Sequence, residues 1–151
     1  MKRLESVFEF GAAWWRKLGM EIVRRTKTLT KRGVGCEGKF AGYTGEYAKR
    51  KADGGFKRQS STSTSPDLQL TGDMLRDLKV KGDVNAQGVT VGWTVWGQRM
   101  LHNAEQGRAI STEEHPLAPA IEAYAMEKYN EEVAQLLRKT AKTDTIPLNI
   151  M

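Results

Sequence analysis

Few side chains in this chain have the type and spacing that catalysis or metal binding requires. His102 and His115 stand thirteen residues apart, with no third nitrogen or thiolate ligand close to either one in sequence. Because zinc sites take three or four such ligands at characteristic spacings, we expect no metal here. Cys36 is the only cysteine, which excludes an internal disulfide and indicates a reducing cytoplasm.

Three carboxylates, Asp67, Asp73 and Asp77, lie close together in sequence. General acid–base catalysis needs groups that converge on one substrate proton. The helical pattern around these residues instead predicts one capping charge with exposed neighbours. The chain also lacks the nucleophile elbow of hydrolases, the paired histidines of zinc proteases and a Walker lysine. We therefore predict no catalytic residue, no cofactor and no enzymatic activity.

Residues 33–38 read Gly-Val-Gly-Cys-Glu-Gly and match the glycine pattern of dinucleotide-binding sites. That motif binds phosphate only where it follows a strand and opens a helix. Here it follows a basic segment and leads into Lys39 and Phe40, so the required context is missing. We interpret residues 33–38 as a flexible loop.

The clearest structural pattern covers residues 65–96. Leu68 and Leu70 alternate with polar residues, which predicts a half-buried extended segment. Thr71 and Gly72 follow as a helix cap and a tight turn, because a threonine hydroxyl can accept a backbone N–H of the first helical turn. They open a short helix with one apolar face.

Two runs of alternating apolar and polar residues follow that helix. They occupy residues 78–81 and 89–95, and the loop between them contains Asn85 and Gly88. This arrangement predicts a β-hairpin with one buried face. A short helical piece from Gly97, ended by Gly107, comes next.

Long helices are predicted at both ends of the chain. Apolar residues between 4 and 30 recur at three- and four-residue steps, and cations crowd the C-terminal end of that pattern. Pro116 and Pro119 start a last helix through residue 141, because proline is tolerated in a first helical turn. We expect the apolar stripe of the last helix to lie across the sheet. The stripe comprises Ile121, Ala125, Tyr129, Val133 and either Leu136 or Leu137.

Residues 38–65 are rich in Gly, Ser, Thr and Lys and form a long flexible arm, too polar to be core. Residues 46–52 can form a short helix within it. Loops this long are usually functional or disordered, so the arm could order against a neighbouring subunit. Its tyrosines and cations could instead contact phosphates and stack on bases. Residues 142–151 form an extended tail whose apolar residues need a docking surface.

The net charge of +6 is unevenly distributed. Residues 1–60 contain 15 Lys and Arg against 6 Asp and Glu, whereas residues 61–151 contain 9 against 12. This polarity suits head-to-tail contact between copies of the chain, and it also suits a nucleic-acid footprint. The chain has no apolar run long enough to cross a membrane, so we expect no membrane partner.

The sequence thus predicts a single domain, residues 1–151, of the α+β class. A small antiparallel sheet with a β-hairpin is packed by a long C-terminal helix and an N-terminal helix. The core with the hairpin and the C-terminal helix spans residues 66–141, and the long flexible arm precedes it.

Three short motifs resemble a known family. They are Phe40-Ala41-Gly42-Tyr43-Thr44 with Tyr47-Ala48 and Lys51, the run from Pro66 through Leu70-Thr71-Gly72-Asp73-Met74-Leu75 to Leu78, and Leu101-His102-Asn103 before Gly107. Together with the valine-rich hairpin they are similar to the tail-completion and head-tail joining proteins of tailed bacteriophages, the HK97-type virion morphogenesis family. Gly42 stands where that family usually has proline.

The resemblance implies a structural protein that forms a ring in the neck, at the head–tail junction of a virion assembled in the host cytoplasm. Six-fold or twelve-fold rings would contact neighbouring connector and tail proteins, with non-specific contact to DNA in the lumen. The implied subunit or partner contacts are Phe40, Tyr43, Tyr47, Lys49, Arg50 and Lys51. The alternative is a nucleic-acid-binding protein that uses the basic N-terminal half.

Overall fold

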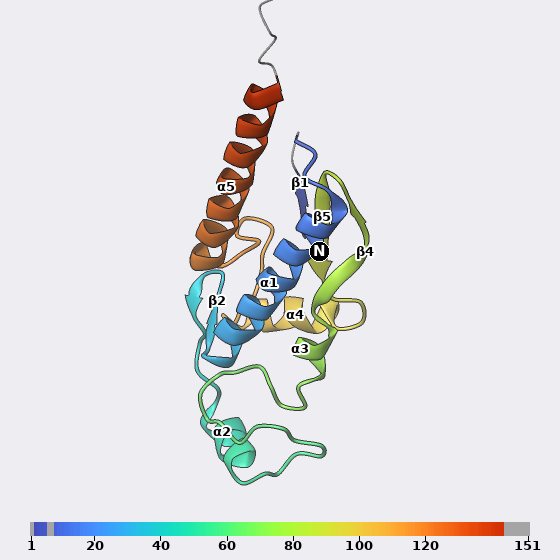
Figure 1. The fold of residues 1–151 in the computed structure, drawn as a ribbon. Coiled ribbons are helices and arrows are strands. Elements are labelled where there is room, and N and C mark those ends of the chain that lie inside the picture. The colour runs from blue at the N-terminus through green and yellow to red at the C-terminus, as the bar shows by residue number, and fades with distance from the viewer. Residues whose placement is uncertain (1, 6–7, 144–151) are drawn as a thin grey trace, which may run out of the picture.

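The computed structural model describes residues 2–5 and 8–143 and has the predicted α+β class (Figure 1). Two small antiparallel sheets are combined with helices of very different length. In chain order the elements are β1 (Lys2–Glu5), α1 (Ala12–Lys31), β2 (Val34–Gly35), β3 (Gly38–Lys39), α2 (Gly45–Ala52), α3 (Asp73–Asp77), β4 (Lys79–Asn85), β5 (Gly88–Gly92), α4 (Gly97–Glu105) and α5 (Pro119–Thr143).

The predicted hairpin is confirmed as β4 and β5, in which Val80 lies opposite Val91 and Asn85 opposite Gly88. The Asn85 side-chain oxygen accepts a hydrogen bond from the backbone N–H of Gln87 at 2.9 Å, which stabilises the two-residue turn. The register shifts between Lys81 and Asn85, so β4 contains an irregularity.

The start of the predicted N-terminal helix was wrong. Residues 2–5 form β1, which pairs antiparallel with β5 and completes the strand order β1-β5-β4. The helix begins only at Ala12, because Gly11 has a φ of 93°, a backbone conformation that favours glycine and cannot continue a helix.

Helix α1 lies against the sheet and forms the main hydrophobic core with it. Trp15, Leu18 and Ile22 pack on Val89 and Val91 of β5. Gly19 permits this approach, because a Cβ there would lie 2.8 Å from a methyl group of Val89. The Trp15 ring nitrogen also donates to the carbonyl oxygen of Ala86 at 2.9 Å, which joins the helix to the hairpin turn.

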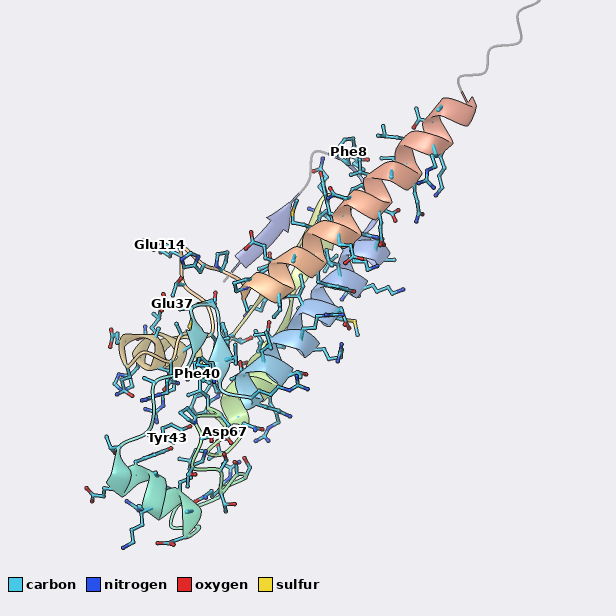
Figure 2. All side chains as sticks on the ribbon, turned by 90° about the vertical axis from the view of Figure 1, so that its left-hand side faces the viewer. Phe8, Glu37, Phe40, Tyr43, Asp67 and Glu114 are labelled. Carbon is cyan, nitrogen blue, oxygen red and sulfur yellow. The ribbon has the colours of Figure 1, made fainter. Side chains whose placement is uncertain are left out.

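Helix α5 begins at Pro119, in the first turn predicted for it. It runs beside α1 rather than across the sheet, as Figures 1 and 2 show, so that expected placement was wrong. Ile121 and Ala125 join the main core, whereas Met126 and Leu137 remain 53% and 56% exposed. Helix α1 makes the extensive contacts with β4 and β5, and α5 packs mainly against α1, so only the first turns of α5 contribute buried side chains to this core.

A second hydrophobic cluster lies between α3 and α4 and includes Phe40 and Ile110. The Trp93 ring nitrogen donates to the carbonyl oxygen of Met74 at 3.0 Å, so the end of the hairpin holds α3 in place. Phe40 is 9% exposed. Its prediction as a contact residue therefore needs correction, since its ring packs inside its own chain.

The interpretation of residues 33–38 as a flexible loop was wrong. They form the β2–β3 hairpin, in which Gly35 is buried. The backbone N–H of Cys36 donates to the carbonyl oxygen of Ala109 at 3.1 Å, and that of Phe40 donates to Gly33 at 2.8 Å. The bond to Ala109 joins the hairpin to the segment that precedes α5, and the bond to Gly33 closes the hairpin itself.

The predicted arm, residues 38–65, is folded onto the domain in part. It contains α2, which ends before Asp53 as the sequence indicates, and the backbone N–H of Ser60 donates to Leu70 at 2.6 Å. The predicted tail lies outside the described residues from 144 onward. No helix in the described part of the chain has the length and hydropathy needed to span a membrane.

Candidate binding cleft between α2 and α4

An open cleft of about 790 Å³ lies between α2 and its flanking arm on one side and α4 on the other. Tyr47 and Phe56 contribute one wall, Leu70 and Met74 lie in the floor, and Arg99 lies in the other wall. This volume falls in the range of ligand-binding clefts. None of the residues that line it is acidic, so we expect its electrostatic potential to be positive.

The aromatic wall is built by the start of α2. The Thr44 hydroxyl accepts a hydrogen bond from the backbone N–H of Tyr47 at 3.4 Å and caps the helix. The cap holds Tyr43 and Tyr47 together, with ring centroids 4.8 Å apart, and Phe56 continues the row 5.2 Å further on. The guanidinium of Arg50 lies 4.4 Å from the centroid of Phe56.

A buried ion pair anchors this wall. Lys51 is fully buried and its Nζ lies 2.5 Å from Oδ1 of Asp67, which is 3% exposed. The Ser61 hydroxyl and the backbone N–H of Gln69 also donate to the Asp67 carboxylate. The Tyr43 hydroxyl accepts from the backbone N–H of Asp67 at 3.3 Å, and Figure 2 shows both residues at the junction of arm and domain.

The environment of Asp67 lowers its pKa. Burial alone would raise the pKa of this carboxyl, but the hydrogen bonds from Lys51, Ser61 and Gln69 outweigh that effect. The ionised form is therefore the stable one in the folded chain. The alternation pattern had suggested an outward-facing Asp67, and the prediction of Lys51 as an exposed contact also needs correction.

The other predicted contact residues have different surroundings. Tyr43 and Tyr47 are half-buried and line the cleft, and burial raises the pKa of both phenols. Lys49 and Arg50 are exposed on the last turn of α2. The structure therefore keeps four of the six predicted residues at an accessible surface.

The opposite wall was missed by sequence reasoning. Arg99 and His102 are exposed on α4, and Arg108 follows that helix. The Arg108 guanidinium donates to the carbonyl oxygen of Gly42 at 3.1 Å and lies 5.3 Å from the centroid of Tyr43. The sequence offered two signals here, the Leu101-His102-Asn103 motif and the three-residue spacing of Arg99 and His102. Neither indicated a cleft, because the partner wall is distant in sequence.

Thr71 and Gly72 line the cleft and lie at the start of α3, as predicted, but the cap position differs from the prediction. Gly72 is the N-cap residue of α3 and has a φ of 76°. The Thr71 hydroxyl lies 3.4 Å from the backbone nitrogen of Asp73, from which it accepts, and donates to the Asp73 carboxylate at 2.8 Å. The cap position is thus one residue later than predicted.

Asp77 positions Trp96, which lines the end of the cleft. One carboxylate oxygen of Asp77 accepts hydrogen bonds from the backbone N–H groups of Thr94, Val95 and Trp96, at 2.8, 2.7 and 3.0 Å. Partial burial would raise the pKa of Asp77, but these three donors hold it below its usual range.

We expect Asp77→Ala to destabilise the chain by about 1–2 kcal/mol at pH 7, because three backbone donors lose a charged acceptor at a partly hydrated site. The lowered pKa means that this stability is present above the unfolded pKa near 4 and is lost as the pH falls through the folded pKa. Urea unfolding at pH 7 and at acid pH measures both effects. Asp53→Ala, at an exposed carboxylate, is the control and should change stability by less than about 0.5 kcal/mol; equal effects of the two variants would contradict the prediction.

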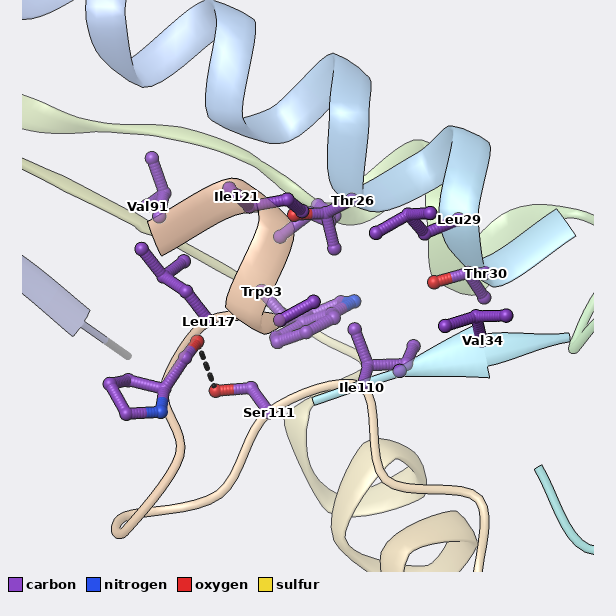
Figure 3. A pocket seen from close by; sticks show the side chains of 14 residues that line it. Thr26, Leu29, Thr30, Val34, Val91, Trp93, Ile110, Ser111, Leu117 and Ile121 are labelled. Carbon is purple, nitrogen blue, oxygen red and sulfur yellow. Dashed lines mark hydrogen bonds between the residues drawn. The ribbon is translucent and has the colours of Figure 1, made fainter. Parts of the chain in front are cut away.

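A second cavity, of about 30 Å³, lies where α1, α5 and the segment around Ile110 meet (Figure 3). Its lining is mostly apolar, and the Ser111 hydroxyl donates to the carbonyl oxygen of Pro116 at 3.0 Å. Thr30 is buried there, and its hydroxyl has no partner among the described residues. This volume suits about one water molecule and no organic ligand.

The described residues contain no group of three or more His, Cys, Asp or Glu side chains that could hold a metal ion. His102 and His115 are both exposed, the first on α4 and the second in the segment between α4 and α5. Asp67, Asp73 and Asp77 each have separate partners and do not converge. Aromatic faces, an apolar floor and cations are the components of a surface that binds another chain.

Comparisons with protein-family models, with curated proteins and with solved structures find no match to this chain.

Proposed function

We propose that this protein is a structural virion protein that forms a ring in the neck of a tailed bacteriophage, at the junction of head and tail. The observation that carries the proposal is the location of the segment with the most specific family resemblance. Residues 70–75 contribute Leu70, Thr71, Gly72 and Met74 to the open cleft. The resembling motif is therefore part of a candidate binding surface.

The distribution of surface side chains supports assembly with copies or partners. Large apolar side chains remain exposed at Val95 just before α4, at Leu101 on α4, and at Met126 and Leu137 on α5. Such residues are unremarkable singly, but together with an aromatic cleft they indicate contact surfaces. The basic and acidic halves of the chain provide complementary charge for head-to-tail contact.

The proposed mechanism is binding alone. Each copy offers an aromatic and cationic cleft on one side, and a ring closes when each cleft is filled by a different surface of the next copy. Desolvated tyrosine and arginine side chains dominate the energy of many such contacts. No bond of a substrate is broken in this process.

Electron microscopy of purified particles tests the proposal directly. For this experiment a small epitope is added after residue 151 and is detected with a gold-labelled antibody. We expect the label at the joint between head and tail, and isolated tails or heads when the protein is withheld. Label at the tail tip or on the capsid surface, or complete particles without the protein, would contradict the assignment.

The exposed cations of the arm favour a second candidate function, nucleic-acid binding. Lys49, Arg50 and Lys57 are exposed close to the tyrosine row. If they bind DNA, the double variant Lys49→Glu/Arg50→Glu should weaken binding at least tenfold and flatten the dependence of affinity on salt. Lys139→Glu, far along α5, is the matched control. Fluorescence anisotropy with a labelled duplex measures both quantities, and unchanged affinity in the double variant would exclude this function for α2.

A further inference from the structure

We propose that residues 144–151 of one copy bind in the cleft between α2 and α4 of a neighbouring copy, so that copies associate head to tail. A ring requires such a contact between neighbouring copies. The place of this contact in a virion rests on the proposed function, but the contact itself can form in purified protein.

The sequence of the segment suits an extended ligand with one apolar side. It reads Asp-Thr-Ile-Pro-Leu-Asn-Ile-Met, and Ile146, Leu148 and Ile150 occupy alternate positions. Alternate side chains of an extended chain point to the same side. Pro147 favours an extended conformation for the residue before it and reduces the entropy lost on binding.

The cleft is complementary to such a segment in shape and polarity. Its floor contains Leu68, Leu70 and Met74, and its walls contain aromatic rings that can cover apolar side chains. Three residues with cationic or titratable nitrogen side chains, Arg99, His102 and Arg108, line it, and no acidic residue does.

The charge of residues 144–151 also suits a cleft lined by arginine. Residues 144–151 contain one aspartate and neither lysine nor arginine. Asp144 precedes the apolar residues, so it could meet an arginine at the rim while Ile146 and Leu148 lie over the floor. A basic segment would be repelled by the same cleft.

The geometry excludes the cleft of the same copy. Helix α5 has 25 residues, which corresponds to a length of about 37 Å. Figures 1 and 2 place the C-terminal end of α5 at one end of the molecule and α2 at the other. Eight residues reach at most about 28 Å when fully extended. This is less than the length of α5, so residues 144–151 cannot run back along α5 and enter the cleft, which lies past the N-terminal end of that helix.

The contact is therefore heterologous, since the donated segment and the receiving cleft are different surfaces. Heterologous contacts generate closed rings when the rotation between copies closes, and filaments when it does not. A ring in which every segment fills the next cleft leaves neither surface unused.

Peptide binding to the full-length chain tests the assignment. The acceptor is a chain with Leu148→Asp and Ile150→Asp, whose own segment no longer competes, and the probe is a fluorescein-labelled peptide of residues 142–151. We expect saturable binding by anisotropy, weakened at least tenfold when Arg99→Glu and Tyr47→Ala are added to the acceptor. Arg16→Glu, at an exposed position of α1, is the matched control and should leave the affinity within about twofold.

Circular dichroism and thermal unfolding establish that each acceptor is folded, and Arg99→Glu alone serves if the Tyr47 variant is not. Absence of peptide binding, or equal binding to the acceptors with and without the cleft substitutions, would overturn the proposal. So would a cleft that binds a single-stranded oligodeoxynucleotide in an Arg99-dependent way and leaves the peptide unbound, because that result assigns it to nucleic acid.

Sedimentation of mixed variants tests the head-to-tail geometry. A chain with the Leu148 and Ile150 substitutions keeps a cleft but no donor, and a chain with Arg99→Glu and Tyr47→Ala keeps a donor but no cleft. We expect each to be monomeric alone and the equimolar mixture to form dimers and nothing larger, whereas the unaltered chain forms larger species. A mixture that stays monomeric, or variants that associate alone as the unaltered chain does, would overturn the contact.

Discussion

We expect Lys51→Met to lower the free energy of unfolding by about 3–5 kcal/mol, because it leaves the Asp67 carboxylate buried without its cation. Methionine has a similar length and no charge, so the loss comes from the unpaired carboxylate and not from a cavity. Both partners are nearly inaccessible to solvent, and water cannot replace the ammonium group. Urea unfolding at pH 7, followed by tryptophan fluorescence, measures the change.

Two variants separate this effect from general damage to α2. Lys49→Met removes a cation from an exposed position of the same helix and should cost less than about 0.5 kcal/mol. Lys51→Met combined with Asp67→Asn replaces the buried charge by a neutral amide, and should be more stable than Lys51→Met alone by about 2 kcal/mol. A double variant no more stable than the single one would refute the unpaired-charge explanation.

The pH dependence of the Lys51→Met effect has a defined sign. In the unaltered chain the pKa of Asp67 lies below its usual range, so the stability from the ion pair is present above the unfolded pKa near 4 and is lost as the pH falls through the folded pKa. Without Lys51, burial raises the pKa of Asp67, and protonation relieves the penalty as the pH falls. The difference in stability between the two chains should therefore shrink between pH 7 and pH 4.

We expect Gly35→Ala to destabilise the chain by about 3 kcal/mol, because the added methyl group has no space. A Cβ at Gly35 would lie 1.8 Å from the carbonyl oxygen of Ala109 and 2.6 Å from a ring carbon of Phe40. The backbone oxygen cannot move alone, since it accepts the hydrogen bond from Cys36. The β2–β3 hairpin must therefore separate from the segment before α5.

Gly45→Ala is the matched control, because nothing lies within 4 Å of a Cβ at that position. Gly45 is the first residue of α2, where alanine is tolerated and reduces the entropy of the unfolded chain. We expect a gain of up to about 1 kcal/mol. Thermal and urea unfolding measure the stability of both variants. Similar stabilities would contradict the prediction and would show that the β2–β3 hairpin is flexible enough to accept the methyl group.

The sequence by itself determined the elements whose signals are local. The β4–β5 hairpin, the stop of α2 before Asp53 and the start of α5 at Pro119 each depend on periodicity and on turn or capping residues within a few positions. The α+β class followed from those elements. For the cleft, local reasoning identified Tyr43 and Tyr47 because aromatic residues stand out in a polar segment.

The tertiary structure alone decided the pairings between distant residues. Strand β1 exists because β5 offers an edge to pair with, and four residues carry too little pattern to predict a strand. Asp67 and Lys51 differ from solvated charges in their burial and in their mutual contact, and no sequence spacing encodes either one. The α4 wall of the cleft was missed for the same reason: a side chain's type fixes what it can bind, but long-range packing fixes which partner lies within reach.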